Sequence, residues 1–280
     1  MVSPLVSTDW LAERLGHADI QVIDASWFLP MESRNGGQEY LEGHIPGAIF
    51  FDIDALSDEG QDLPHMLPTP EAFAVAAGKL GLSPASTQVV YDTVGIRSSA
   101  RVWWNLRAMG FEKVFVLDGG MKAWRAAGLP EETGLVSLTA TTLQPHFAAD
   151  LVADISDVRK ALSTGSEQVV DARAAARFSG DAPEPRPGVK PGHMPGALNL
   201  PFDRLLTPEG RMKAPEDLTQ TFETAGVDLD RPIITTCGSG VTASVIALAL
   251  ERLGRSGVAV YDGSWSEWGG RPDTEIATGA

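Results

Sequence analysis

The sequence is poor in cysteine and in basic residues. It has one cysteine in 280 residues, Cys237, so an intramolecular disulfide and a zinc site built on several cysteines are both excluded. Only 22 Lys and Arg residues stand against 37 Asp and Glu, which gives a formal net charge of -15 at pH 7. Because nucleic acids and acidic membrane surfaces are bound through basic faces, this balance argues against both as partners. A small anionic substrate remains compatible with it, since local arginines decide the charge of a pocket.

Long hydrophobic runs are also absent. No uninterrupted apolar stretch approaches the ~18 to 20 residues that span a bilayer, so no transmembrane helix is predicted. Residues 1–10 contain neither a basic segment nor an apolar segment of the kind found in secretory signals. With the lone thiol, these absences predict a cytoplasmic protein without a membrane partner. What is present is a globular composition, 43% hydrophobic, in a chain long enough for two domains.

An internal repeat organises the chain. Three motifs recur in the same order and at nearly the same offset: 43–49 (GHIPGAI) as 192–198 (GHMPGAL), 22–25 (VIDA) as 169–172 (VVDA), and 117–124 (LDGGMKAW) as 261–268 (YDGSWSEW). Such a repeat predicts two copies of one domain. We expect an N-terminal domain over residues 1–135, a linker over 136–150 without clear periodicity, and a C-terminal domain over 151–280.

Each copy alternates short apolar runs with helical patterns. The predicted strands are 20–23, 87–91, 114–117, 168–171, 233–236 and 258–261, and the predicted helices are 71–80, 98–109, 215–225 and 243–253. This alternation predicts an α/β fold in which each domain is a mainly parallel sheet flanked by helices. Ligands of such sheets bind outside the carboxyl ends of the strands, and Cys237 directly follows a predicted strand.

Cys237 opens a loop of small residues, Cys-Gly-Ser-Gly-Val-Thr, which leads into the helix predicted at 243–253. The free N–H groups of this loop and the helix N-terminus favour negative charge on the sulfur, and the thiolate is the nucleophilic form of cysteine. The alternative is a buried structural thiol, which does not need a glycine-rich loop. In the first copy Asp92 aligns with Cys237 and cannot carry out thiol chemistry. The N-terminal domain is therefore predicted to be non-catalytic.

The duplicated Gly-His-Ile/Met-Pro-Gly-Ala motif, the Asp-Gly-Gly/Ser motif with its tryptophan and the single Cys loop of the second copy resemble the two-domain rhodanese-type sulfurtransferases. The resemblance covers nearly the whole chain and implies two tandem rhodanese-like domains. The loop from Cys237 to Thr242 is most similar to that of the 3-mercaptopyruvate sulfurtransferases. Thiosulfate-specific relatives carry basic residues where this chain has Gly238 and Ser239.

This resemblance implies an enzyme that moves sulfur from 3-mercaptopyruvate to a thiol acceptor or cyanide and releases pyruvate. The intermediate would be a covalent persulfide on Cys237, with no separate cofactor and no metal. The implied partners are a small anionic thiol substrate and an acceptor such as thioredoxin or a low-molecular-weight thiol, and two fused repeats suggest a monomer. The residues expected to cradle the persulfide are Gly238, Ser239, Gly240, Val241 and Thr242.

The resemblance also assigns roles to residues outside the loop. Arg177 and Arg186 stand where the family binds its substrate, and a guanidinium suits a carboxylate; for both, the alternative is a solvated surface charge. Ser239 would form a proton relay with Asp54 and His65 of the first domain. For His65 a structural role after Pro64 stays open.

Two further residues near these motifs have other expected roles. Arg173 is interpreted as structural, and Trp265 is expected to border the site.

Three other functions remain to be weighed. Thiosulfate sulfurtransferase activity is the nearest alternative, and a non-enzymatic persulfide carrier is another. A cysteine phosphatase of the Cys-x5-Arg type uses a similar loop, but its phosphate-binding arginine would fall at Ala243. That substitution disfavours phosphatase activity.

Overall fold

The computed structural model describes residues 3–58 and 60–279, which form two compact units. The first unit contains residues 3–58, 67–148 and 208–212, and the second contains 60–66, 149–207 and 213–279. Two short segments, 60–66 and 208–212, thus belong to a different unit from their neighbours in the chain. None of the helices in the described ranges is both long and apolar enough to cross a membrane.

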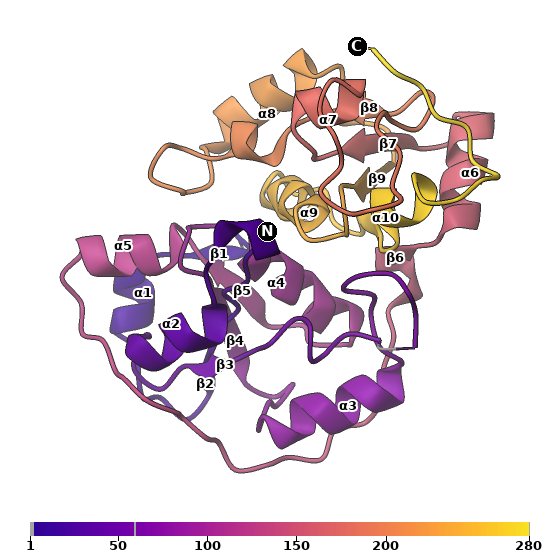
Figure 1. Ribbon diagram of the computed structural model, residues 1–280. Helices are drawn as coiled ribbons and strands as arrows, with labels where there is room; N and C mark the ends of the chain where they lie inside the picture. The colour runs from indigo at the N-terminus through magenta and orange to yellow at the C-terminus, as the bar shows by residue number, and fades with distance from the viewer. Residues whose placement is uncertain (1–2, 59, 280) are drawn as a thin grey trace. The chain divides into compact units, whose positions relative to one another are not determined.

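The first unit is built on a parallel five-stranded sheet of order β1-β5-β4-β2-β3. Its strands are β1 (Leu5–Val6), β2 (Ile20–Asp24), β3 (Ile49–Phe50), β4 (Thr87–Tyr91) and β5 (Val114–Leu117). Its α-helices are α1 (Thr8–Ala12), α2 (Gly36–Glu42), α3 (Pro70–Lys79), α4 (Ser98–Ala108) and α5 (Gly120–Ala126), and η1 (Pro30–Glu32) is a 3-10 turn. Helices α1 and α5 lie on one side of this sheet and α3 and α4 on the other (Figure 1).

The second unit repeats this arrangement with the strand order β6-β10-β9-β7-β8. Its strands are β6 (Val152–Ala153), β7 (Gln168–Asp171), β8 (Leu198–Asn199), β9 (Ile233–Thr236) and β10 (Ala259–Tyr261). Its α-helices are α6 (Ile155–Thr164), α7 (Ala175–Ser179), α8 (Pro215–Thr224), α9 (Ala243–Arg252) and α10 (Ser264–Trp268), and η2 (Ala149–Leu151) and η3 (Phe202–Leu205) are 3-10 turns. The matching strand orders confirm the predicted duplication of a parallel α/β domain.

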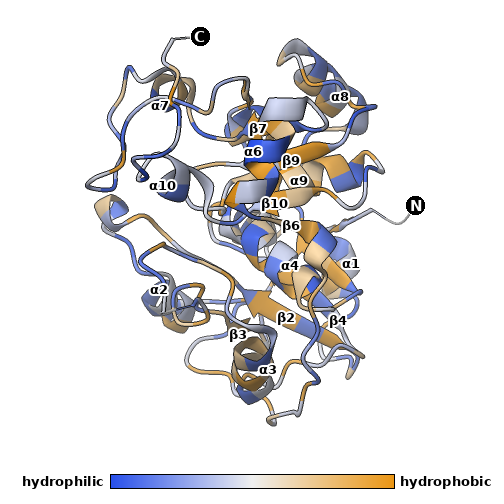
Figure 2. Cartoon of the chain, turned by 90° about the vertical axis from the view of Figure 1, so that its right-hand side faces the viewer, coloured by the Kyte–Doolittle hydropathy of each residue, from blue (hydrophilic) through white to orange (hydrophobic). Residues whose placement is uncertain are grey.

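The central strands are buried on both faces, which explains why they appear in the sequence as continuous apolar runs. Val89, Val90 and Tyr91 of β4 are all fully buried. In the second unit Trp265 of α10 packs in a core with Ile234 of β9. Figure 2 shows α6 with both hydrophilic and hydrophobic residues, as expected of a helix with one face on the core. The sheets are therefore rigid supports for the loops that follow their strands.

Candidate active site

Strand β9 ends directly before Cys237, and α9 begins after the loop of residues 237–242. Helix α10 holds the first half of this loop. Trp265 donates its backbone N–H to the Cys237 carbonyl at 2.9 Å, and Ser266 donates its N–H and its hydroxyl to the Gly238 carbonyl at 2.9 and 2.6 Å. The Ser264 hydroxyl accepts the Cys237 N–H at 3.2 Å. Hydrogen bonds thus fix both the N–H and the carbonyl of Cys237. The residue is only 2% exposed.

The remaining N–H groups of the loop are uncommitted. Among the residues that the structure describes, no acceptor takes the backbone N–H of any residue from 238 to 242. Gly240 has a φ of 75°, in the left-handed region that lets successive amides turn inward. Free N–H groups at the beginning of a helix form a binding site for an anion. This loop can therefore stabilise a thiolate or persulfide anion without a charged side chain.

The first unit contains the equivalent loop with an anion already in place. Asp92 follows β4 as Cys237 follows β9, and both loops have six residues before the next helix. The Asp92 carboxylate accepts the N–H groups of Val94 and Gly95 at 3.0 Å, of Arg97 at 2.8 Å and of Ser99 at 2.9 Å. The Ser99 hydroxyl donates a further bond at 2.7 Å. A loop of this geometry thus binds a negative group through its amides.

Arg177, in α7, lies against the cysteine loop. A Cβ atom added to Gly238 would lie 3.0 Å from Nη2 of Arg177, so the glycine leaves room for the guanidinium. Glu184 accepts a hydrogen bond from Nε of Arg177 at 3.2 Å and another from Nη2. The Arg177 side chain is 25% exposed, so its remaining N–H groups can meet a ligand.

Arg173 is buried and committed to protein partners. It donates two hydrogen bonds from Nε and one from Nη2 to the Asp171 carboxylate at 2.7 to 3.1 Å, and Nη1 donates to Glu184 at 2.8 Å. Its guanidinium carbon lies 4.2 Å from the centre of the Trp265 ring. Burial would lower the pKa of Arg173, but Asp171 and Glu184 outweigh it and raise the pKa. Arg173 therefore has the structural surroundings expected from the sequence.

His65 and Arg186 lie together within the second unit, because segment 60–66 belongs to that unit. Nη2 of Arg186 lies 3.3 Å from Nε2 of His65. Since a guanidinium only donates, Nε2 accepts and the imidazole proton of His65 lies on Nδ1. His65 is 6% exposed and has a φ of 62°, a strained left-handed conformation of the kind that gathers at functional sites.

The other members of the predicted relay have separate surroundings. Asp54 belongs to the first unit, where it accepts the Trp27 indole N–H at 2.9 Å. Ser239 belongs to the second unit and is 6% exposed. The relay through Ser239, His65 and Asp54 stays a prediction.

Sequence reasoning missed Glu184 and the two serines of α10, Ser264 and Ser266. Glu184 stands two residues before Arg186 in a proline-rich segment, and an acidic residue between two predicted substrate arginines was an available signal. The serines gave no such signal, because their role is to bind the backbone of a distant loop.

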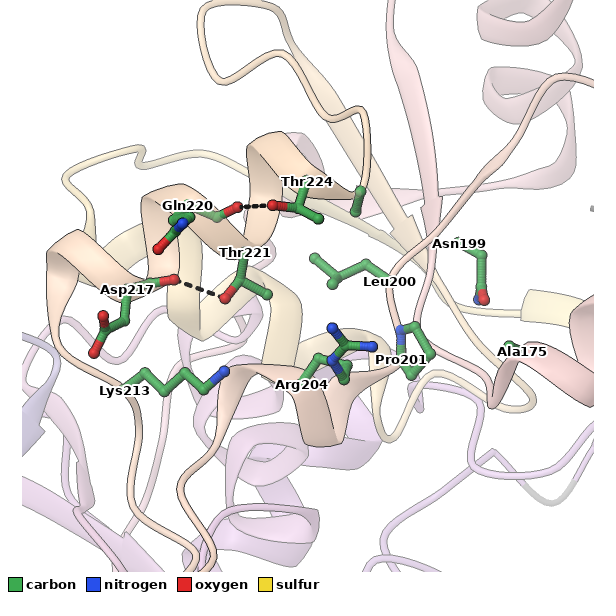
Figure 3. A pocket seen from close by; sticks show the side chains of 11 residues that line it. Ala175, Asn199, Leu200, Pro201, Arg204, Lys213, Asp217, Gln220, Thr221 and Thr224 are labelled. Atoms are coloured by element: carbon green, nitrogen blue, oxygen red, sulfur yellow. Dashed lines mark hydrogen bonds between the residues drawn. The ribbon is translucent and has the colours of Figure 1, made fainter.

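A separate cavity of about 460 Å³ lies between η3, α8 and the end of β8 (Figure 3). Its polar lining includes Arg204, Lys213, Thr221 and Thr224. It contains no residue of the cysteine loop, so it is separate from the candidate active site.

Comparison with known proteins agrees with the fold. The chain matches the rhodanese-like domain family over residues 7–127 and again over 154–271. It is 48% identical to the 3-mercaptopyruvate sulfurtransferase of Escherichia coli K12, over 97% of this chain and 96% of that protein. It is 42% identical to thiosulfate/3-mercaptopyruvate sulfurtransferase 1 of Arabidopsis thaliana, a mitochondrial protein, over 98% of this chain and 78% of that one.

A solved structure gives the same result. The crystal structure of SseA from Escherichia coli, which has the rhodanese fold, superposes with a TM-score of 0.87 at 45% identity. The superposition covers 94% of this chain and 99% of that one. With two matched domains, two sheets of the same strand order and a cysteine loop in the second unit, the chain belongs to the rhodanese family.

Proposed function

We propose that this chain is a 3-mercaptopyruvate sulfurtransferase that works through a persulfide on Cys237. The observation that carries the proposal is the loop itself: the backbone N–H groups of residues 238–242 donate to no described protein group, and the guanidinium of Arg177, from α7, lies against Gly238. Thiosulfate is a compact dianion that favours cations beside the sulfur. 3-Mercaptopyruvate carries its carboxylate away from the sulfur, where Arg177 and Arg186 are suited to bind it.

In the first half-reaction the Cys237 thiolate attacks the sulfur of 3-mercaptopyruvate. The S–S bond forms as the C–S bond breaks, and its electron pair leaves with the carbon as the enolate of pyruvate. A proton then converts the enolate to pyruvate. The amides of residues 238–242 stabilise the persulfide anion, as an oxyanion hole stabilises an alkoxide.

In the second half-reaction a thiolate acceptor, or cyanide, attacks the outer sulfur of the persulfide. The S–S bond breaks and its electron pair returns to Cys237 as thiolate, so the enzyme is regenerated with no net redox change. A thioredoxin or a low-molecular-weight thiol fits this step, and the covalent persulfide takes the place of a cofactor. We further propose a monomer in a reducing compartment such as the cytoplasm, because a lone catalytic thiol must stay reduced.

The proton for the enolate requires a donor near the sulfur. Ser239 is the hydroxyl closest to Cys237 in sequence, and we propose that it acts with His65 and Asp54 as a relay. The contact with Arg186 engages Nε2 of His65, so the relay would use the Nδ1 proton or would exchange this contact when the substrate binds.

Thiosulfate is a second candidate donor. The Arabidopsis relative, whose name includes both donors, favours this activity as a side reaction of the same cysteine. The uncharged Gly238 and Ser239 support a lower kcat/KM for thiosulfate than for 3-mercaptopyruvate.

The test is the release of pyruvate from 3-mercaptopyruvate with cyanide as acceptor. We expect robust turnover by the wild type, a gain of one sulfur on Cys237 by mass spectrometry when the acceptor is omitted, and loss of both in Cys237→Ser. A higher kcat/KM for thiosulfate would contradict the substrate assignment. Sulfur loading without turnover would support a carrier instead.

A further inference from the structure

Glu184 joins two arginines of the second unit through one buried carboxylate. Its side chain is 3% exposed. Oε1 accepts from Nη1 of Arg173 at 2.8 Å and from Nε of Arg177 at 3.2 Å, and Oε2 accepts from Nη2 of Arg177. Charge-assisted hydrogen bonds with little access to water are the stronger ones in proteins, so Glu184 fixes both guanidinium groups.

Together with contacts of Trp265, these pairs form a continuous series of contacts that starts at one residue of the cysteine loop and returns to another. The N–H of Trp265 donates to the carbonyl of the catalytic cysteine, and the Arg173 guanidinium stacks on the Trp265 ring. Glu184 connects Arg173 to Arg177, which lies against Gly238. Arg173 is further fixed to the sheet, because it also pairs with the aspartate that ends β7. The orientation of Arg177 is thus fixed relative to the loop that contains the cysteine.

The pairing also selects which edge of Arg177 is available. Nε and Nη2 face the Glu184 carboxylate, so the two N–H groups of Nη1 and the second hydrogen of Nη2 remain for a ligand. An arginine that is held before the substrate arrives loses less conformational freedom on binding, which strengthens binding for the same contact.

We propose that Glu184 is a positioning residue, which orients Arg177 to receive the carboxylate of the sulfur donor. The inference rests on the proposed function, because the donor must carry a carboxylate. Glu184 acts through Arg177 and does not touch the donor itself.

The test compares Glu184→Gln with the wild type on two donors. The amide of glutamine turns an N–H donor toward an arginine, so Arg177 loses a bond and its fixed orientation. We expect the KM for 3-mercaptopyruvate to rise about tenfold or more, which corresponds to the loss of one charged hydrogen bond, while kcat falls less than about threefold. For mercaptoacetone, in which a methyl group replaces the carboxylate, kcat/KM is expected to be unchanged. Glu184→Asp, which keeps the charge, is expected to restore part of the KM.

Glu131→Gln is the matched control. Glu131 makes a two-point pair with Arg125 in the first unit, so the substitution removes the same kind of ion pair there. Its KM is expected to equal that of the wild type. An unchanged KM in Glu184→Gln, or an equal loss with mercaptoacetone and 3-mercaptopyruvate, would overturn the proposal and leave Glu184 a structural role.

Pyruvate binding separates this proposal from the proposed function. Pyruvate has the carboxylate but no transferable sulfur, and its affinity for each variant can be measured by tryptophan fluorescence. If the wild type fails to turn over 3-mercaptopyruvate while Glu184→Gln weakens pyruvate binding, the proposed function fails and the role of Glu184 stands. Equal pyruvate affinities in the two proteins would exclude that role whatever the turnover.

Discussion

The aspartate of the duplicated Val-Ile/Val-Asp-Ala motif has different surroundings in the two units. Asp171 pairs with Arg173, whereas Asp24 has Ser26 at the equivalent position and accepts its N–H at 2.8 Å. Burial raises the pKa of Asp24 to about 6, against the opposing effect of hydrogen bonds from Ser26 and Tyr91. One inherited residue therefore serves an ion pair in the second unit and remains a weak buried acid in the first.

This difference predicts a pH dependence of stability. The folded pKa of Asp24 exceeds the unfolded value of 3.8, so its stabilising contribution is fully present below about pH 4 and is lost as the pH rises through 6. The free energy of unfolding that Asp24 contributes and then loses is about 3 kcal/mol in total, because its pKa differs by roughly two between the folded and unfolded states and each pKa unit corresponds to about 1.36 kcal/mol. We expect Asp24→Asn, which is neutral at every pH, to flatten the decline in melting temperature between about pH 4 and pH 7. The measurement is a series of calorimetric scans of the full chain.

Asp19→Asn provides the comparison for that series. Asp19 is exposed just before β2, so its substitution changes the same charge without changing a buried group. It should leave the pH dependence of the melting temperature as in the wild type. The same slope in Asp24→Asn and in the wild type would show that Asp24 does not carry the effect.

At the scale of elements, the loop between β4 and α4 depends on its own carboxylate. Asp92 is the acceptor for four backbone N–H groups and one hydroxyl. Asparagine offers one acceptor oxygen and turns an NH₂ group toward these donors. We expect Asp92→Asn to destabilise the first unit by about 2 to 4 kcal/mol, because buried donors lose their partner. Calorimetry and hydrogen exchange of the amides at the beginning of α4 measure this.

Cys237→Ser is the counterpart in the second unit. No loop amide from 238 to 242 donates to a described protein group, so replacing the sulfur breaks no such bond. We expect its melting temperature to change by far less than that of Asp92→Asn. Equal losses in the two variants would argue that the two loops are held in the same way.

The elements that could be predicted are those with enough residues to form a pattern. The strands predicted at 87–91, 114–117, 168–171 and 233–236 are found with the same bounds. The edge strands β1, β3, β6 and β8 have two residues each and were missed, because two residues display no alternation. Helices of five to seven residues, such as α7 and α10, were also missed, because they are too short to display the helical period of apolar residues.

The candidate site was predictable where one local motif carries the chemistry. The Cys237 loop follows a strand and precedes a helix as its small residues indicated, and Arg177 lies beside it. Glu184 escaped notice because its importance depends on two arginines brought together by the fold. For segment 60–66, only the family resemblance linked His65 to the second domain. No short-range pattern in the sequence indicates that a whole segment belongs to a different unit from its neighbours in the chain.

At the scale of the whole molecule, the repeat boundary and the boundary of the compact units differ. A fragment of residues 149–280 contains the cysteine, Arg177 and Arg186, but it lacks segment 60–66 of the same unit and with it His65. We expect this fragment to melt at a lower temperature than the full chain, because the buried His65 and its contact with Arg186 are lost. Scanning calorimetry of both proteins measures the difference. An equal melting temperature would show that segment 60–66 contributes nothing to the second unit.

The negative charge of the whole molecule contrasts with the balanced charge of one cluster at the candidate site. Arg173 and Arg177 are balanced by Asp171 and Glu184, so this cluster adds no net charge to a chain of formal charge -15. On the proposed function, the backbone amides of residues 238–242, the N–H groups left on Arg177 and the guanidinium of Arg186 supply the attraction for an anion. These groups contact the anion at distances well below the Debye length of ~8 Å, so salt hardly screens them. Negative charges on the surface that lie farther away than this length are largely screened.

The carboxylate of Asp92 can be viewed as a tethered ligand. A group attached to its own binding loop has an effective concentration that free anions in solution do not approach, so the first unit is permanently saturated. On the proposed function, only the loop of the second unit can take up an anion from solution. Each chain of 280 residues should therefore store a single sulfur atom and titrate with a stoichiometry of one, however much donor is supplied.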